Sequence, residues 1–283
     1  MICILGAAGR IGHMLYATWP ANRTQPVIRQ GRGAAPVGGL CWDMLVEPVP
    51  PEMPRGSVIL NLAGVTRGDE TALTANVTLA LAALDAAQET AARHVFLCSS
   101  AAVYGAGHGQ DLGEEDPTDP VNPYGRAKLA MEVAAERWAA EHPAIGVTVL
   151  RIGNVAGADA LLGGAVAGRP VTLDPVPGHD RGPERSYIGP WALGQVLAGL
   201  ADLACTGQPL PFRLNIAAPG VVGMADLLRT ADLPWGWGPP NPSAVARVGL
   251  NTARLEALLP GAAGAGNAEA LIADWRRWKE ATA

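Results

Sequence analysis

Cysteine is scarce in this chain, and its few copies lie far apart. They are Cys3, Cys41, Cys98 and Cys205, and no two of them form a CxxC pair. Cys3 and Cys98 stand inside apolar strand-like runs, where a small buried thiol is the ordinary interpretation. The spacing therefore predicts neither a disulfide framework nor a zinc or other metal site, which fits a reducing cytoplasm.

Excess positive charge and long apolar segments are missing as well. The 21 basic residues face 26 acidic ones, so the net charge of −5 leaves no basic stripe for phosphates and excludes nucleic acid as the main partner. The first apolar run, Met1 to Leu5, breaks into glycine and is too short for a signal peptide or a membrane-spanning helix. We therefore expect a globular, cytoplasmic protein that binds a small molecule and does not enter a membrane.

In the first half of the chain, short β-branched runs alternate with longer helical patterns. The strand candidates are 2–5, 26–28, 58–62, 95–98 and 147–152, and helical patterns cover about 11–19, 70–91 and 124–141. This alternation is typical of α/β proteins, in which helices cover both faces of a parallel sheet. The fold class that we predict is therefore a doubly wound, Rossmann-like parallel sheet.

The first expected strand runs directly into a glycine-rich segment, ILGAAGRIG. Its three glycines precede a helical pattern, and glycine lets the backbone approach a pyrophosphate that sits on the exposed N–H groups of a helix N-terminus. A tight structural turn is the alternative, so the motif depends on its position between a strand and a helix. In that position it predicts a dinucleotide site formed by Gly6, Gly9, Arg10, Ile11 and Gly12.

The end of the second expected strand has no acidic residue for the cofactor's ribose. None occurs between Gly12 and Asp43, and the segment VIRQGRG offers Arg29 and Arg32 instead. Guanidinium groups suit a 2′-phosphate, so the sequence favours NADP over NAD, although both arginines could be plain surface residues. Asp43 could accept a hydrogen bond from the adenine amine or could cap a turn.

Lysine is rarer than any other charged residue, and its placement is informative. Only Lys128 and Lys279 occur, and Lys128 follows Tyr124 by four residues in NPYGRAKLAME, so the two share one helix face. A free phenol has a pKa near 10, and an adjacent ammonium favours the phenolate. Tyr124 is thus predicted to exchange a proton with a substrate alcohol or carbonyl during hydride transfer, while Lys128 tunes it and binds ribose hydroxyls.

Two serines stand at the end of an apolar strand in VFLCSSAAVYG. A hydroxyl at the carboxyl end of a parallel strand faces the crevice in which ligands bind. Ser100 is therefore predicted to hold a substrate carbonyl against Tyr124. Ser99 could take that role instead, or both serines could cap a turn.

The composition changes after Gly153, where glycine and proline become frequent. We expect residues 1–155 to form the dinucleotide-binding Rossmann domain, to which 191–217 returns with a helix and a strand. Residues 156–190 and 218–283 are expected to form a small C-terminal substrate-binding lobe.

Together these segments resemble the extended short-chain dehydrogenase/reductase family, of the NAD(P)-dependent sugar epimerase/dehydratase type. The resemblance covers roughly the first 220 residues. It implies that GxxGxxG binds the cofactor and that YxxxK opens the active-site helix. It also identifies Ser100, four residues before Tyr104, as the catalytic hydroxyl that acts with Tyr124 and Lys128.

The resemblance implies further site residues outside these motifs. LNLAG places Leu62, Ala63 and Gly64 on the nicotinamide side of the cofactor, and NVTLA supplies a helix asparagine, Asn76. LRIGNVAG and RSYI match segments that contact the substrate. The implied substrate contacts are Ser100, Ala101, Asn154 and Arg185.

The chain also departs from the family pattern. Family dehydratases carry an Asp–Glu pair directly after the catalytic hydroxyl, and this chain has Ala101 and Ala102 there. Because no acid is present to protonate a leaving hydroxyl, we do not expect sugar dehydration. The segment 155–184 is short for a full nucleotide clamp. His179 and Arg181 in GHDRGPER could supply replacement anion contacts or belong to a solvated loop.

The sequence thus predicts an NAD(P)-dependent oxidoreductase or epimerase that acts on a hydroxyl or ketone of a sugar or nucleotide sugar. A ketoreductase of a small non-nucleotide substrate is one alternative, and a non-catalytic cofactor-sensing protein is another. Family members often dimerise through two helices. The alanine-rich segments 78–92 and 129–140 suit such packing, so a homodimer is expected by resemblance.

Overall fold

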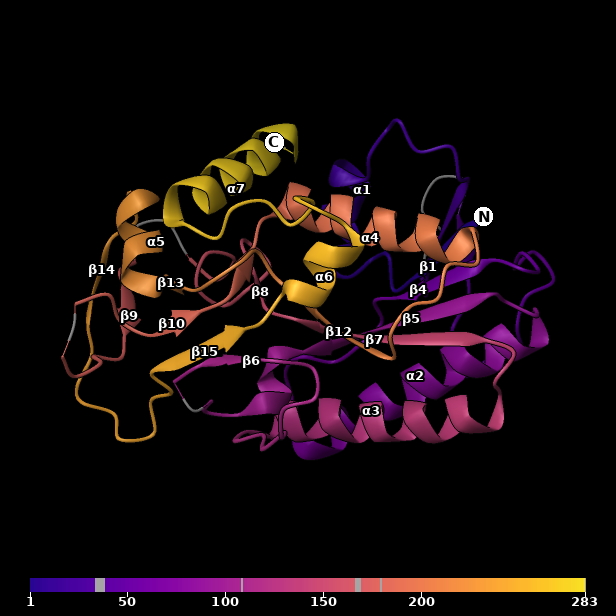
Figure 1. Cartoon of the computed structure of the whole chain (residues 1–283), viewed down its shortest axis with the longest axis horizontal. Coiled ribbons are helices and arrows are strands. Elements are labelled where there is room, and N and C mark those ends of the chain that lie inside the picture. The colour runs from indigo at the N-terminus through magenta and orange to yellow at the C-terminus, as the bar shows by residue number, and fades with distance from the viewer. Residues whose placement is uncertain (34–38, 108, 166–168, 179, 283) are drawn as a thin grey trace.

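The computed structural model describes residues 1–33, 39–107, 109–165, 169–178 and 180–282 (Figure 1). Its main sheet has seven parallel strands in the order β12-β7-β5-β4-β1-β2-β3. Every residue of β1 and β4 is buried, as expected of central strands covered on both faces. The strands are β1 (Ile2–Leu5), β2 (Val27–Gly31), β3 (Leu40–Cys41), β4 (Val58–Asn61), β5 (His94–Ser100), β7 (Gly146–Ile152) and β12 (Arg213–Ile216).

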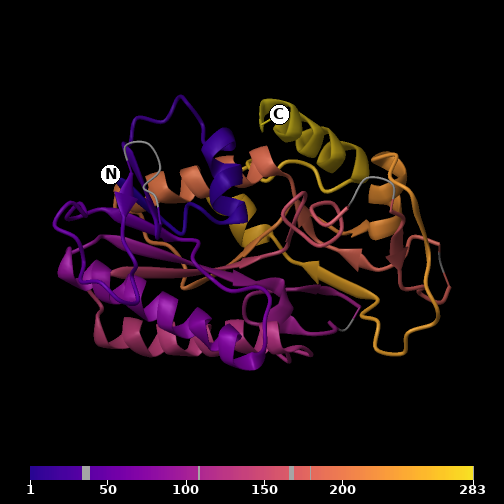
Figure 2. The same ribbon diagram turned by 180° about the vertical axis from the view of Figure 1, so that it is seen from behind.

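Helices cover both faces of this sheet. α1 (Arg10–Thr18) and α4 (Pro190–Cys205) pack on one face, and α2 (Glu70–Glu89) and α3 (Pro123–Glu141) lie side by side on the other (Figures 1 and 2). Each helix pair closes a separate apolar cluster against the sheet. The predicted doubly wound α/β class is therefore confirmed.

The strand order reverses beside β1. From β1 the chain continues to β2 and β3 on one side of the sheet, whereas β4, β5 and β7 follow on the other side. The carboxyl ends of β1 and β4 therefore flank the crevice in which open α/β sheets bind ligands.

Smaller sheets and helices extend beyond the carboxyl ends of the main strands (Figure 1). A four-stranded sheet has the order β13-β10-β15-β6, and β11-β8 and β14-β9 form two pairs. The strands are β6 (Asp111–Leu112), β8 (Asn154–Val155), β9 (Val171–Leu173), β10 (Glu184–Arg185), β11 (Tyr187–Ile188), β13 (Val222–Gly223), β14 (Trp235–Trp237) and β15 (Arg247–Leu250). The helices are η1 (Ala101–Tyr104), α5 (Met224–Thr230), α6 (Ala253–Leu258) and α7 (Ala268–Thr282).

β6 lies between β5 and α3 along the chain, yet it pairs with β15. A segment from the first 155 residues thus takes part in the second sheet, and the division of the chain at residue 155 stays a prediction. Within the described parts of the chain, no helix combines the length and apolar character needed to cross a membrane.

His94, the first residue of β5, is buried, and its hydrogen-bond partner is a neutral hydroxyl. Its Nε2 lies 3.0 Å from Oγ1 of Thr148 on β7, and its ring packs against Phe96. Burial lowers the pKa of His94 from 6.5 to about 4, because the protonated ring would lose its hydration. The folded state therefore holds this imidazole neutral.

This burial predicts a loss of stability in mild acid. Because the pKa of His94 is lower in the folded state than in the unfolded state, the neutral ring stabilises the folded state fully above about pH 6.5. This stabilisation is lost as the pH falls toward about 4. Urea unfolding should show the free energy of unfolding falling by roughly 2 kcal/mol more in the wild type than in His94→Gln between about pH 7 and about pH 4.5. His13→Gln, at an exposed position of α1, should follow the wild type. Parallel curves for the wild type and His94→Gln would contradict this prediction.

Candidate active site

A cavity of about 680 Å³ opens at the carboxyl end of the main sheet. That volume is within the range of small-molecule and cofactor sites. Its lining comes from the glycine loop, the loop after β4, the end of β5, the start of α3, β8, β10 and β15. The predicted site residues found in this lining are Gly9, Arg10, Ile11, Gly12, Leu62, Gly64, Ser100, Ala101, Tyr124, Lys128, Asn154 and Arg185.

The glycine loop packs so closely that its glycines are required. Gly6 has φ +71°, and a Cβ there would lie 2.5 Å from the backbone nitrogen of Ala63. A Cβ at Gly12 would overlap the carbonyl of Ala7. Gly9 caps α1 with no side-chain hydrogen bond, so the first N–H groups of the helix are available to an anion. This cradle fits the pyrophosphate of a dinucleotide.

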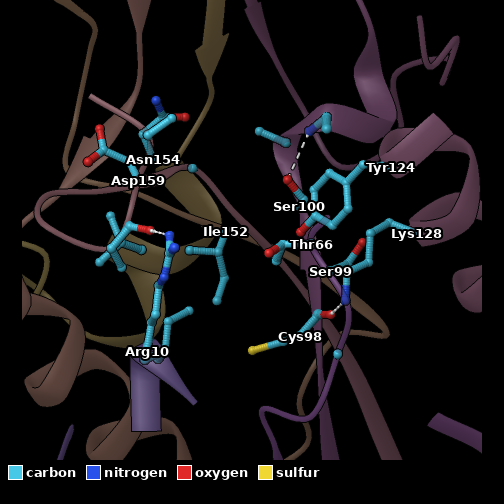
Figure 3. Close-up of a pocket in the computed structure, with 18 of the residues that line it drawn as sticks. Arg10, Thr66, Cys98, Ser99, Ser100, Tyr124, Lys128, Ile152, Asn154 and Asp159 are labelled. Carbon is cyan, nitrogen blue, oxygen red and sulfur yellow. Dashed lines mark hydrogen bonds between the residues drawn. The ribbon is translucent and has the colours of Figure 1, made fainter. Parts of the chain in front are cut away.

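Arg10 adds a positive charge at this cradle. It is the first residue of α1, and its guanidinium donates to the carbonyl of Ala158, with Nη1 and the oxygen 3.4 Å apart, on the side of the cavity that faces Ser100 and Tyr124 (Figure 3). The start of α1 is thereby linked to the loop that follows β8.

Gln30 also supports the glycine loop, and the sequence analysis did not single it out. It is buried on β2, and its Oε1 accepts a hydrogen bond of 2.8 Å from the Gly6 amide, while its Nε2 donates to the Trp42 carbonyl. A buried amide that bridges two adjacent loops has no local sequence signature.

Some predicted cofactor residues lie outside the cavity lining. Arg29 stacks on Tyr16 of α1, with the guanidinium 5.0 Å from the ring centroid, and burial lowers its pKa. Asp43 accepts a hydrogen bond of 3.1 Å from the Leu45 amide, so it occupies the turn position that was the alternative for it. Arg32 is exposed just beyond β2.

Asn76 acts on the loop that follows β4. Its Nδ2 donates to the carbonyl of Val65 and its Oδ1 accepts from the amide of Val65, at 2.9 and 3.2 Å. A Cβ at Gly64 would lie 3.0 Å from Oδ1 of Asn76 and 3.1 Å from Nζ of Lys128. The loop after β4 therefore lies directly against Lys128 at Gly64. Asn76 holds the loop in this position through its two hydrogen bonds to Val65.

Ser100 and Tyr124 meet at the end of β5. Ser100 accepts a hydrogen bond of 3.2 Å from the Ala102 amide of η1, and its side chain lies next to that of Tyr124 (Figure 3). Tyr124 occupies the first turn of α3, where Asn122 caps the helix by accepting from the Gly125 amide at 2.8 Å. The helix cap and the strand end therefore set the two side chains side by side.

The pKa of Tyr124 differs from the sequence-based expectation. Burial raises the pKa of Tyr124 to about 12, and the neighbouring Ser100 hydroxyl offsets only part of that rise. Lys128 is only 4 % exposed, donates to the carbonyl of Cys98 at 2.8 Å, and holds its Nζ 5.9 Å from the Tyr124 ring centroid. The predicted lowering by Lys128 is therefore not found among the groups of the protein, because desolvation of the phenolate dominates. The phenol of Tyr124 is therefore held in its neutral form.

A buried ion pair lies one turn after Lys128 on α3. Glu132 is 1 % exposed and pairs with Arg151 of β7 at 2.7 Å between Oε2 and Nη2. Ser99, which was the alternative to Ser100, donates its hydroxyl to Glu132. This network clamps α3 to β5 and β7.

The opposite wall of the cavity carries Asn154 and Arg185. Arg185 donates to the carbonyls of Glu184 and Val245, each at 2.7 Å, and no carboxylate among the described residues pairs with it. Burial lowers its pKa. Arg181 pairs with Asp226 and Glu184 outside the cavity lining, and His179 lies outside the described residues.

Comparison with known proteins places this arrangement in a family. A model of the NAD dependent epimerase/dehydratase family matches residues 2–167. The chain belongs to this family. The resemblance inferred from its motifs is thereby confirmed. UDP-glucose 4-epimerase of Lactobacillus helveticus is 38% identical over 85 residues, which cover 30% of this chain and 26% of that enzyme. The matched segments thus span about a quarter of such relatives.

Solved structures share the whole fold at low sequence identity. UDP-glucose-4-epimerase from Stenotrophomonas maltophila, with bound NAD and formylated UDP-arabinopyranose, has a TM-score of 0.81 at 17% identity and covers 99% of this chain and 98% of its own. The NAD-dependent NDP-hexosamine 5,6-dehydratase TunA has a TM-score of 0.81 at 18% identity, over 99% and 97%. Epimerases and dehydratases are therefore both among the chains with this fold.

The buried ion pair yields a prediction about stability. Glu132→Gln leaves the guanidinium of Arg151 buried without its counter-charge, which should lower the free energy of unfolding by about 3 kcal/mol. Glu136→Gln is the matched control, because Glu136 lies one turn further along α3 and pairs with Arg213 in a mostly solvated position. Its cost should stay below about 1 kcal/mol. If urea unfolding showed equal losses of free energy for the two variants, burial of the Glu132–Arg151 pair would not determine its contribution to stability.

Proposed function

We propose that this chain is an NAD(P)-dependent enzyme that oxidises or reduces a hydroxyl or ketone of a sugar or nucleotide sugar. The proposal is carried by the adjacent side chains of Ser100 and Tyr124, which line one cavity together with the glycine loop that precedes α1. UDP-sugars are named for the curated relative and for the epimerase of the same fold. A bound nicotinamide would supply or accept the hydride.

Ser100, Tyr124 and Lys128 have different roles in this proposal. The Ser100 hydroxyl holds the substrate oxygen, and Tyr124 donates a proton to that oxygen when a ketone is reduced, as its raised pKa favours. In the oxidative direction Tyr124 must first release its proton to solvent, which the positive charge of a bound oxidised nicotinamide would favour, and its phenolate would then accept the proton of the substrate hydroxyl. Lys128, anchored on the Cys98 carbonyl, directs its remaining N–H groups to cofactor ribose hydroxyls.

Within this family we propose epimerisation or net reduction over dehydration. Ala101 and Ala102 follow Ser100 in the cavity wall and cannot protonate a leaving hydroxyl. Among the described lining residues the only carboxylate is that of Asp159, and it accepts hydrogen bonds from the protein itself. Transfer of hydride to a bound ketone and release of the alcohol gives net reduction, whereas oxidation of a hydroxyl to a ketone that rotates before the hydride returns gives epimerisation.

A ketoreductase of a small non-nucleotide substrate is the second candidate. It is favoured by the apolar part of the cavity wall, where Val121, Val245 and Val248 face the space beside Ser100. Val121 is 56% exposed, so an apolar substrate group could cover it.

For the cofactor we propose NADP, with NAD as the alternative. Arg32 follows the end of β2 and is exposed, so its guanidinium is accessible to a 2′-phosphate at the position where NAD enzymes place an acid. The solved relatives described above are NAD proteins.

For the assembly we propose a homodimer through α2 and α3. A shallow hollow on this face includes Val77 of α2 with Leu129 and Val133 of α3, and Val133 is 40% exposed. Apolar side chains on two adjacent helices are suited to pack against the same face of a second copy.

Loss of the phenol tests the proposed function. Tyr124→Phe should lower turnover at least about 100-fold, because the substrate oxygen loses its proton donor. Interconversion of UDP-glucose and UDP-galactose, and NAD(P)H oxidation with keto-sugars, measure it. Tyr16→Phe changes an exposed tyrosine of α1 and should keep full activity. Turnover that survives in Tyr124→Phe would remove this mechanism, and a wild type inactive on all such substrates would favour the second candidate.

Removal of the exposed guanidinium tests the cofactor proposal. Arg32→Ser should raise KM for NADPH about tenfold and leave KM for NADH unchanged, because only NADPH carries the 2′-phosphate. Arg55→Ser provides a control at another exposed arginine, which contacts the Glu89 carbonyl at the end of α2. Equal effects on both cofactors would argue for NAD.

A further inference from the structure

The cavity wall next to Ser100 is apolar. The chain passes from β5 directly into η1, and Ser100 caps that helix by accepting from the Ala102 amide at 3.2 Å. Ala101 and Ala102 both line the cavity. The side chains that follow the proposed substrate-binding hydroxyl along this wall are therefore two methyl groups.

β15 and the segment before α3 extend this apolar surface. Val248 of β15 belongs to a buried apolar cluster, against which Val245 and Ala101 also pack. At the other end of η1, a Cβ at Gly105 would lie 3.5 Å from Cγ1 of Val121, which is exposed. We name this surface the alanine–valine patch; its members, which all line the cavity, are Ala101, Ala102, Val121, Val245 and Val248.

Two polar side chains border the alanine–valine patch, and each already has a hydrogen bond to the backbone. Oδ1 of Asn122, which follows Val121, accepts from the Gly125 amide at 2.8 Å. Arg185 donates to the Val245 carbonyl at 2.7 Å. The side chains of the patch itself offer no donor and no acceptor. A hydroxyl that covered the patch would lose its hydrogen bonds to water without replacement, whereas a methyl group is stabilised by leaving water there.

The shape of a sugar determines which of its groups meets the patch. In the proposed function the reacting carbon lies at Ser100 and Tyr124 (Figure 3). A substituent on the neighbouring ring carbon then lies beside Ser100, against Ala101 and the valines. In an ordinary hexose that reacts at C4, the neighbouring C5 carries a hydroxymethyl group. In a 6-deoxyhexose the same carbon carries a methyl group.

We propose that the alanine–valine patch selects a nucleotide sugar of the 6-deoxyhexose class, which reacts at C4 and places its C6 methyl group on the patch. This inference rests on the proposed function, and it deepens that function by naming the substrate class. The valines that favour a small apolar substrate thus also fit the apolar part of a sugar. Because a C6 methyl group is formed when a hexose loses its C6 hydroxyl as water, a dehydration reaction must supply this substrate.

Two substrates that differ in one oxygen atom test the proposal with the holoenzyme. The kcat/KM for UDP-6-deoxyglucose should exceed that for UDP-glucose about tenfold, because only UDP-glucose has a C6 hydroxyl to desolvate. Interconversion of the C4 epimers, and NAD(P)H oxidation with the corresponding 4-keto sugars, measure both values. Equal values, or a preference for UDP-glucose, would overturn the proposal.

Hydroxyl groups added to the patch test whether the patch causes this preference. Ala101→Ser and Val121→Thr should each bring the ratio of the two kcat/KM values to within about threefold, because the C6 hydroxyl then finds a partner. Val46→Thr is the matched control, since Val46 is 81% exposed, lies outside the cavity lining and should keep the ratio. Each ratio compares two substrates on one protein, so a loss of folded protein cancels. A ratio that both patch variants leave intact would contradict the role of the patch.

Binding separates this inference from the proposed function. Tyr124→Phe, loaded with cofactor, should bind UDP-6-deoxyglucose about tenfold more tightly than UDP-glucose in isothermal titration calorimetry. If neither sugar were turned over by the wild type while this preference held, the proposed function would fail and the inference would stand. Turnover of both sugars with equal affinities would retain the function and remove the inference, as would the absence of binding of either sugar.

Discussion

The buried pair of Glu132 and Arg151 is the constraint on which the arrangement of the active site depends. It ties the third turn of α3 to β7, while Ser99 ties the same carboxylate to β5. Tyr124 lies two turns earlier on that helix, beside Ser100 at the end of β5, so any rotation or sliding of α3 would separate them. Because an isolated buried charge is far more costly than a paired one, the helix has one strongly preferred position.

Other buried polar side chains hold the loops that line the cavity. Gln30 and Asn76 use both ends of their amides on backbone groups, and so they hold the glycine loop and the loop after β4 in place. Asp159 accepts from two backbone amides and from the Tyr187 hydroxyl, and so it fixes the loop after β8.

Sequence patterns revealed the parts of this site that are local along the chain. GxxGxxG follows a strand and YxxxK opens a helix, so the sheet class and the places of Ser100, Tyr124 and Lys128 could be derived from spacing. Glu132 and Arg151 lie 19 residues apart and become partners only through packing, which no spacing rule encodes. The raised pKa of Tyr124 has the same origin, because it reflects burial that the tertiary structure creates. Asp43 accepts a hydrogen bond within its own turn, and its contact with the adenine amine stays a prediction.

The pairing of β6 with β15 has a mechanical consequence. The segment between β5 and α3 begins at Ser100 and ends near Tyr124. Its middle, Asp111 and Leu112, forms β6 and pairs with β15 in the four-stranded sheet. The four-stranded sheet is thus joined to the segment that connects Ser100 with Tyr124. A displacement of this sheet relative to the main sheet would therefore also displace that segment and change the spacing of the two hydroxyls.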